Sequence, residues 1–484
     1  MIRGTLMNQL FRTKNVTAED INKGDLKRCL SAFDLTLLGV GAIIGAGIFV
    51  LTGRAAATEA GPAITLSFVI AGIACACAAL AYAELASTVG GAGSAYAYGY
   101  AGLGEFPAWV IGWMLILEYT VAISTVAVGW SGYFNNGLQA LFGAGLPESL
   151  LHGPWEAAGG IVNLPAFVIV AALGLLLARG AKISARFNAV MVLVKVAAIL
   201  LFLAVAIGHL EPSNWSPYIP AEVIDANGKT HFGFQGVLTG AATIFFAYIG
   251  FDAVSTAAEE CENPGRDLPI GIIGSLAICT FFYMAVSGVL TGIVPYTELN
   301  TPSPVASALL MIGQEWAAGL ISIGAIAGLT TVMLVLYFAI TRILFAISRD
   351  GLLPPFFSHV SEATKSPVRV IVLIGVLMCG LAGFLPLDRL AELTNIGTLG
   401  AFVVVCAGVM TLRRTHPHLP RGFRAPFGPA IPVLGIGFCL WLMVSLRHET
   451  WQAFGVWLIA GLCIYFGYSM RHSRLAEQSA TGGA

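Results

Sequence analysis

Long apolar runs alternate with short polar connections along almost the whole chain. A helix needs about 20 apolar residues to cross the hydrocarbon core of a bilayer, so each run predicts a transmembrane helix. We expect twelve such spans, near residues 34–57, 63–88, 105–130, 163–179, 187–208, 235–258, 269–293, 317–346, 368–385, 392–412, 430–446 and 451–469. Two short amphipathic pieces, 90–102 and 303–315, are expected outside the spans.

Composition supports this interpretation. Of the 484 residues, 57% are hydrophobic and only 11% are charged, whereas soluble proteins carry about 25% charged residues. The chain is therefore predicted to be an all-α polytopic membrane protein that contacts the lipid bilayer. A net charge of −1 indicates no nucleic-acid partner. The nine cysteines are scattered and show no metal-ligand spacing, so no metal site and no cofactor is expected.

The placement of lysine and arginine predicts the orientation. With twelve alternating spans, most basic residues fall on one side, including six in the 1–33 arm and others at Arg179, Lys182, Arg186, Arg266, Arg349, Lys365, Arg369, Arg413, Arg414, Arg421, Arg424, Arg471 and Arg474. The positive-inside rule makes that side cytoplasmic. Both the arm, which lacks the apolar region of a signal peptide, and the tail 471–484 are therefore expected in the cytoplasm.

A glycine cluster interrupts the first span, with the sequence Gly39-Val-Gly-Ala-Ile-Ile-Gly-Ala-Gly47. One interpretation is close helix packing, because Gly41 and Gly45 fit the small-xxx-small contact motif. The other is a broken helix whose free backbone groups serve a ligand, because backbone groups in hydrocarbon must find a partner. A nucleotide-phosphate loop is disfavoured by the glycine spacing and by the absence of a βαβ pattern.

A second break is predicted five spans later, where Gly250 and Asp252 interrupt an apolar run. Matching broken helices are typical of transporters built from two inverted repeats. The expected domain therefore covers 34–470, with repeats 34–208 and 235–412 and two extra helices in 430–469. Backbone N–H groups near 45–48 suit a carboxylate, and carbonyls near Ile43 and 245–247 suit an ammonium group, which together favour an α-amino acid.

Several motifs now indicate a family. They are Gly41-Ala-Ile-Ile-Gly-Ala-Gly-Ile-Phe49, Ser184-Ala-Arg-Phe-Asn-Ala189, Phe245-Phe-Ala-Tyr-Ile-Gly-Phe-Asp252, Glu259-Glu-Cys-Glu-Asn-Pro264 and Ser348-Arg-Asp-Gly-Leu-Leu-Pro354. With these, the chain resembles the bacterial cationic amino acid transporter family of the amino acid–polyamine–organocation superfamily, from residue 32 to about 469. The resemblance implies a five-plus-five inverted-repeat fold with broken helices one and six, and amino-acid transport, commonly coupled to protons, across the inner (cytoplasmic) membrane of a cell.

The resemblance also implies substrate contacts on both broken helices, at Ile43, Gly45, Ala46, Gly47, Phe246, Ala247 and Ile249. Relatives often have a hydroxyl residue at the position of Ala46, so one polar contact is absent. Ala46, Ala247 and the glycines are expected to leave room for a small neutral side chain. Phe246 would then form an apolar cover above the substrate.

Two ionisable residues inside spans are candidates for coupling, because such residues are costly in the membrane and are functional by default. For Lys195, the resemblance implies an ammonium group that stands in for a cation between spans one and eight and can hold the first helix through carbonyls near 39–42. The alternative is a lysine that snorkels to the cytoplasmic face. Glu118 could carry a proton, contact a cationic side chain, or be a structural partner.

The predicted function is secondary active transport of L-amino acids, with protons as the expected coupling partner. A proton-independent exchanger or uniporter is the alternative. A channel would need continuous polar rings, and an enzyme would need a nucleophile with a base or a metal cluster; neither pattern is visible, so no catalytic residue is expected. The sequence leaves open which amino acid is moved, and whether a small membrane subunit is a further partner.

Overall fold

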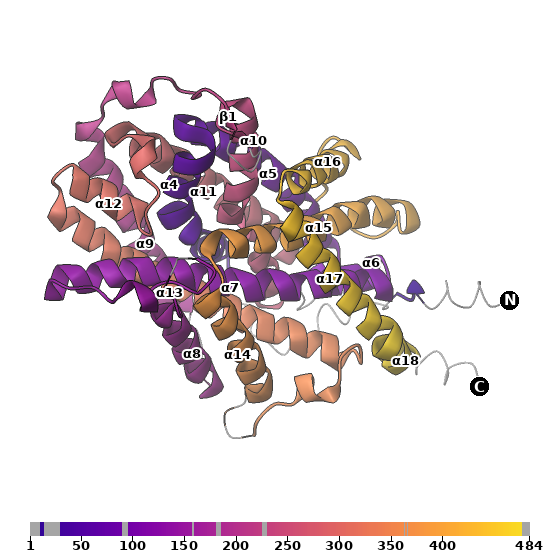
Figure 1. Cartoon of the computed structure of the whole chain (residues 1–484). Coiled ribbons are helices and arrows are strands. Elements are labelled where there is room, and N and C mark those ends of the chain that lie inside the picture. The colour runs from indigo at the N-terminus through magenta and orange to yellow at the C-terminus, as the bar shows by residue number, and fades with distance from the viewer. Residues whose placement is uncertain are drawn as a thin grey trace, which may run out of the picture.

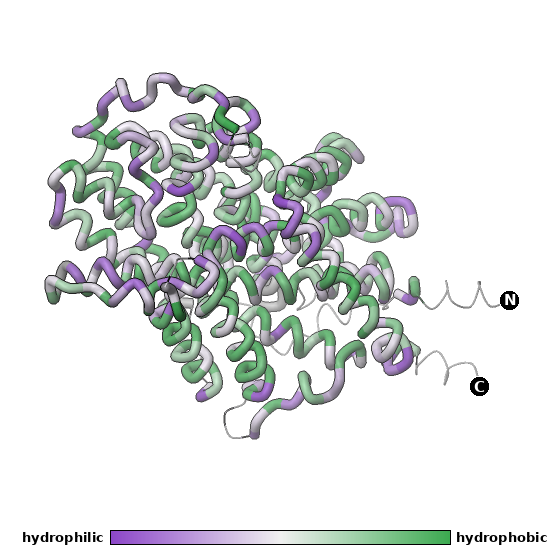
Figure 2. Tube along the Cα trace, in the orientation of Figure 1, coloured by the Kyte–Doolittle hydropathy of each residue, from purple (hydrophilic) through white to green (hydrophobic). Residues whose placement is uncertain are grey.

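The computed structural model describes residues 10–13, 30–89, 95–156, 159–180, 185–224, 230–362, 364 and 366–476. These residues form a bundle of helices (Figure 1). Apolar residues cover most helices, and polar residues gather at helix ends and connections (Figure 2). Within the described residues, eight helices are long and apolar enough to cross a membrane. The chain is therefore a polytopic membrane protein.

Helices occur at each of the first five predicted spans. Their bounds are α3 Ala32–Ile43 with α4 Thr52–Ala55, α5 Ile64–Val89, α7 Glu105–Phe142, α8 Leu164–Ala178 and α9 Ala185–Ala206. Before α7 lies α6, Ala95–Gly102, on the first predicted amphipathic piece; residues 90–94 of that piece lie outside the described residues.

The remaining predicted spans are helical as well. Their bounds are α10 Gly233–Ile244, α11 Pro264–Ile293, α13 Glu315–Arg349, α14 Val368–Phe384, α15 Leu387–Thr415, α16 Ala430–Val444 and α17 His448–Ile464. Two short helices accompany them, α12 Pro304–Met311 on the second amphipathic piece and α18 Met470–His472.

Local sequence explains where the first span, from α3 to residue 60, begins and ends. Ser31 caps α3 in a reciprocal capping box: its hydroxyl accepts from the Asp34 N–H, and the Asp34 carboxylate accepts from the Ser31 N–H at 3.0 Å. Such a cap satisfies donors that a helix start leaves free. At the far end, Gly61 has φ +62° and turns the chain into α5. A side chain at Gly61 would be strained there.

Two short strands modify the all-α prediction. In the long connection after α9, β1 (Val223–Ile224) pairs antiparallel with β2 (Thr230–His231). Residues 225–229, which include Lys229, lie outside the described residues. The His231 ring lies 2.6 Å from the Thr58 carbonyl, so the hairpin rests against the end of the first span.

The helices with the interrupted segments lie in the interior. The apolar stretches of α7 and α10 are almost wholly buried, whereas α17 lies at the periphery. Around α3 pack α9, α11 and α13, and α11 also packs against α5. The interruptions are therefore surrounded by protein rather than by lipid, as irregular backbone at membrane depth requires.

The first and last described segments meet at the start of α7. The buried Glu105 carboxylate accepts hydrogen bonds from Tyr100, Tyr465 and Ser473. Its backbone N–H donates to the Arg12 carbonyl at 2.9 Å. Residues 10–13 and the segment around α18 are thus held at the same end of the bundle (Figure 1).

Candidate functional site

The first span is broken at Ile44. Helix α3 ends at Ile43, Ile44 has the extended conformation (φ −69°, ψ 104°), and the chain resumes as a π-helical turn at Gly47. The Ile44 N–H still donates to the Val40 carbonyl at 3.0 Å. Among the described residues, the N–H groups of residues 45–48 have no backbone acceptor. They form the positive end of the second half-helix, which favours an anion.

The sixth predicted span is broken as well. One 3₁₀ turn, Phe245–Tyr248, follows α10, and Ile249 is extended. Gly250 then adopts φ +114°, and a second 3₁₀ helix runs from Phe251 to Glu260. The positive φ explains the glycine, because other residues are strained in that region.

The two breaks pack against each other through their glycines. A Cβ on Gly47 would lie 2.3 Å from the Ala247 Cα, and a Cβ on Gly250 would lie 2.9 Å from the Ala42 carbonyl carbon and oxygen. Both contacts are to backbone, which cannot yield as a side chain can. Close packing and a broken helix, which the sequence posed as alternatives, therefore occur together.

Gly41 and Gly45 do not form a single helix contact. A Cβ on Gly41 would meet Val192 of α9 at 2.7 Å, whereas a Cβ on Gly45 would meet Val332 of α13 at 3.3 Å. The small-xxx-small interpretation of this pair is wrong, because the two glycines face different helices. The contact at Gly45 is also the looser of the two.

Freed carbonyls from the two breaks converge on one hydroxyl. The Tyr283 Oη of α11 lies 2.9 Å from the Ile43 carbonyl oxygen and 2.6 Å from the Ala247 carbonyl oxygen. A phenol has one proton, so the two acceptors share it. These carbonyls lie in the regions that the sequence assigned to an ammonium group. Tyr283 was missed, because a tyrosine in an apolar run gives no signal of its partners.

A second residue that sequence reasoning missed is Asn395 of α15. Its side-chain amide donates to the Ala242 carbonyl at 2.8 Å and to the Thr243 carbonyl at 3.2 Å. These carbonyls belong to the last turn of α10, which lacks helical partners next to the break. Asn395 therefore satisfies backbone that the second interruption exposes.

All seven predicted substrate contacts lie in the protein interior at or beside the two breaks: Ile43, Gly45, Ala46, Gly47, Phe246, Ala247 and Ile249. The expected room is not present beside Gly47, because Ala247 fills that space. The reason is tertiary: helix six approaches closely enough to contact the glycine. In this conformation the breaks are closed around each other.

Lys195 points inward from α9. Its Nζ donates to the Gly41 carbonyl at 2.6 Å, and only 1% of the residue is exposed. The aliphatic stem lies along Gly328 of α13, where a Cβ would be 3.0 Å from the lysine Cγ. The ammonium group therefore lies between the first span and α13, the eighth predicted span, and it does not snorkel to the surface.

Glu118 of α7 is fully buried near Asp252, just beyond the second break. Tyr119 donates to the Asp252 carboxylate at 2.6 Å. Neither Glu118 oxygen has a hydrogen-bond partner among the described residues. The Thr398 hydroxyl is close, but its proton goes to the Thr394 carbonyl at 3.1 Å. The position keeps Glu118 a functional candidate, because an unpaired carboxyl is costly in the membrane.

Other polar residues of the predicted spans serve structure. The buried Glu84 of α5 accepts from Arg413 Nε at 2.8 Å and from the Ala425 N–H at 2.7 Å. It thereby fixes the connection after α15. Among the described residues, no cluster of His, Cys, Asp or Glu has the arrangement of a metal site.

Comparisons with known proteins show which family the chain is similar to. Residues 30–467 match the family model described as amino acid permease. The chain is 50% identical to the methylthioribose transporter of Bacillus subtilis (strain 168), over 97% of this chain and all of that protein. It is 49% identical to the branched-chain amino acid permease BcaP of the same organism, over 98% of this chain and all of that protein. It is 30% identical to the human cationic amino acid transporter 4, over 98% of this chain and 92% of that protein.

Proposed function

The chain belongs to the amino acid permease family, whose members are transporters and not enzymes, and from this premise we propose that it moves L-amino acids by secondary active transport. The family membership agrees with the resemblance that the motifs carried. The proposed cycle is alternating access, in which the site between the broken helices opens to one side of the membrane at a time.

We infer that the fold contains twelve spans with two inverted repeats, 34–208 and 235–412, and two further helices within 430–469. The two interruptions support this, because they occur five spans apart and contact each other. The distribution of lysine and arginine supports cytoplasmic termini. The end of the bundle with Glu105 would then face the cytoplasm, and the opposite end would face outward.

The substrate class is inferred from the backbone groups at the breaks, where hydrogen-bond donors and acceptors outside the helical ladder lie together. The N–H groups of residues 45–48 provide donors for an α-carboxylate. The Ile43 and Ala247 carbonyls, now shared by Tyr283, provide acceptors for an α-ammonium group. Half-helix ends of this kind serve anionic substrate groups in other transporters. The side chain would extend toward Phe246 and Ile249.

We expect the free amino acid to bind and its derivatives to fail. In a thermal-shift assay, a ligand at about 100 times its dissociation constant stabilises the folded state by about 2.7 kcal/mol. Leucine, isoleucine, valine or alanine should raise the melting temperature, whereas their methyl esters and N-acetyl derivatives should not. Equal stabilisation by the esters would contradict the role of the N–H groups at the first break.

A second candidate substrate is methylthioribose, for which one 50% identical relative is named. This thioether sugar has neither a carboxylate nor an ammonium group, so the free backbone ends offer it no charged contact. The same assay separates the candidates. Stabilisation by methylthioribose alone, with no response to any of the twenty amino acids, would overturn the proposed substrate class.

Replacing Tyr283 by phenylalanine should lower uptake about five-fold or more, because two buried carbonyls at the breaks lose their donor, a cost of about 1–3 kcal/mol. The matched control is Tyr337→Phe, since the buried Tyr337 of α13 donates to the Ile371 carbonyl at 2.6 Å, away from the breaks. Both variants should lose thermal stability, but only the Tyr283 variant should lose uptake per folded protein. Equal uptake by both would reduce Tyr283 to a structural residue.

We propose protons as the coupling ion, with Lys195 and Glu118 as candidate sites. The support is the buried Lys195 ammonium on the first broken helix. A proton-independent exchanger or uniporter is the alternative. Counterflow in proteoliposomes distinguishes any such carrier from a channel, because a channel does not accumulate labelled substrate against its gradient when unlabelled substrate leaves.

A further inference from the structure

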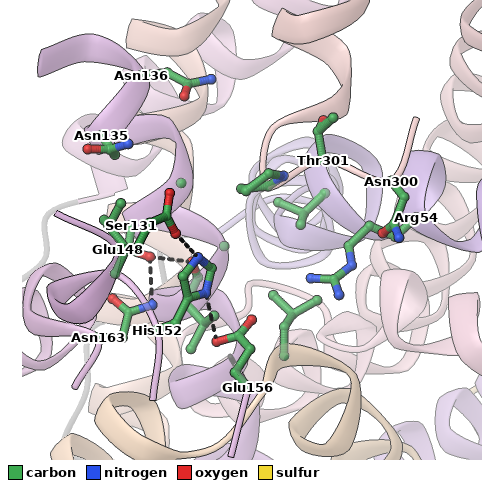
Figure 3. A pocket seen from close by; sticks show the side chains of 17 residues that line it. Arg54, Ser131, Asn135, Asn136, Glu148, His152, Glu156, Asn163, Asn300 and Thr301 are labelled. Atoms are coloured by element: carbon green, nitrogen blue, oxygen red, sulfur yellow. Dashed lines mark hydrogen bonds and ion pairs between the residues drawn. The ribbon is translucent and has the colours of Figure 1, made fainter. Parts of the chain in front are cut away.

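A cavity of about 420 Å³ lies beside the later part of α7, toward the end of that helix opposite Glu105. Figure 3 shows the side chains that line it. Val50, in the π-helical turn that follows the first break, and Gly129 of α7 both line it. A Cβ on Gly129 would lie 3.0 Å from Val50 and 3.6 Å from the Ala46 Cβ. The cavity therefore reaches within one helical turn of the proposed substrate site. Its volume lies in the range of about 300–1,000 Å³ that is typical of small-molecule sites.

Opposite walls of this cavity carry opposite charges. Arg54 of α4 lies on one wall, and Glu148, His152 and Glu156 lie on the other (Figure 3). The Arg54 guanidinium pairs with Asp388 through one nitrogen at 3.0 Å. A guanidinium has five N–H donors, so that pair leaves donors for a second anion.

The acidic wall keeps acceptors for a cation. His152 Nε2 lies 3.0 Å from the Glu148 carboxylate, and His152 Nδ1 lies 3.3 Å from the Glu156 carboxylate. A carboxylate has about four acceptor positions, and the imidazole contacts one oxygen of each. The Glu156 side chain is only 18% exposed and Glu148 is 85% exposed, so Glu156 is the inner ligand and Glu148 lies at the rim.

We propose that this outer cavity is a binding site for zwitterionic α-amino acids on their path to the helix breaks, with Arg54 holding the carboxylate and Glu156 the ammonium group. The inference rests on the proposed function and on the outward orientation of this end. A zwitterion meets a complementary charge on each wall, whereas a simple anion or cation meets one wall of its own sign. The site thus recognises the main-chain groups of an amino acid and does not discriminate between side chains.

The test is the Michaelis constant for uptake from each face of the membrane. In right-side-out vesicles, Arg54→Gln and Glu156→Gln should each raise the KM about two- to five-fold. This is the effect of losing one partly exposed charge contact. The KM in inside-out vesicles should not change. Since the helix breaks are untouched, the maximal rate in right-side-out vesicles should not change either. Equilibrium fixes the ratio of maximal rate to KM in the two directions, so the maximal rate in inside-out vesicles should fall by the same factor as the outer KM rises.

Two matched variants serve as controls for the expected rise in KM. One tests whether the rise comes from losing the ion pair between Arg54 and Asp388, and the other tests whether it comes from a general change in surface charge. Asp388→Asn breaks the same ion pair as Arg54→Gln but keeps the guanidinium, so its KM should equal that of wild type or be lower. Glu298→Gln removes an exposed carboxylate on the same side of the protein but outside the cavity, and it should have no effect.

The outcomes are distinguishable. Unchanged KM values in the Arg54 and Glu156 variants would overturn the outer site and leave the proposed function intact. A KM rise of equal size from both faces, or a rise in Asp388→Asn that matches the Arg54 variant, would also overturn it. Wild-type protein that transports no amino acid from either face would contradict the proposed function and this inference together.

Discussion

Replacing Gly47 by alanine should reduce uptake per folded protein at least about ten-fold, which is the largest effect we expect from a single added methyl group. The new Cβ would lie 2.3 Å from the Ala247 Cα, and a backbone atom cannot move aside without separating the two broken helices. Overpacking of this kind costs about 1–3 kcal/mol, and an energy of that size changes an equilibrium about 5- to 150-fold.

Gly274→Ala is the matched control, because it makes the same chemical change on α11, away from the two breaks. There the Cβ would lie 3.4 Å from the Thr36 hydroxyl oxygen and 3.5 Å from its methyl group, which are ordinary van der Waals distances. Uptake should stay within about two-fold of wild type, the effect of less than about 0.5 kcal/mol. Uptake is measured in proteoliposomes after size-exclusion chromatography has confirmed that both variants are folded. Full uptake by Gly47→Ala would show that the contact between the breaks is not needed for transport.

Substituting Lys195 should remove the response of transport to a proton gradient. With the membrane potential clamped, one pH unit across the membrane supplies about 1.4 kcal/mol per proton. This equals about ten-fold accumulation of a neutral substrate at one proton per substrate. The wild type should show this accumulation, and Lys195→Ala should show none, because the contact of the ammonium group with Gly41 is lost.

The coupling argument needs a group that exists in two protonation states and that interacts differently with two conformations. A charged Lys195 donates strongly to the first broken helix, and a neutral amine donates more weakly. Lys195→Arg should therefore also fail to cycle, since a guanidinium stays charged and the stem has little room beside Gly328. If wild type ignores the gradient, or if Lys195→Ala responds fully, the lysine is a structural cation.

The positions of the helices were predictable because the bilayer imposes length and polarity on each span. Every predicted span contains a helix, and both breaks fall at the glycines that indicated them. The end of α7 was not predicted: the helix runs on to Phe142, twelve residues beyond the expected limit at 130. Residues 131–142 mix polar and apolar side chains, so hydropathy gives no clear limit for the helix there.

The candidate site was predictable as far as local backbone chemistry determines it. The glycines and the span pattern indicated free N–H and carbonyl groups, and Lys195 contacts a carbonyl within the predicted stretch 39–42. Tyr283 was not predictable, because its partner Ile43 is 240 residues away in sequence. The contact of Gly47 with Ala247 also depends on how two distant helices meet, which no local pattern encodes.

The position of Glu105 has a consequence for how the chain is completed during synthesis. Two of the three side-chain donors to its buried carboxylate, Tyr465 and Ser473, belong to the last helical segment. In a nascent chain that stops before residue 465, the Glu105 carboxylate would lack these two donors. An unsatisfied buried charge is strongly destabilising. We therefore expect a chain truncated before residue 465 to be less stable than the full-length protein.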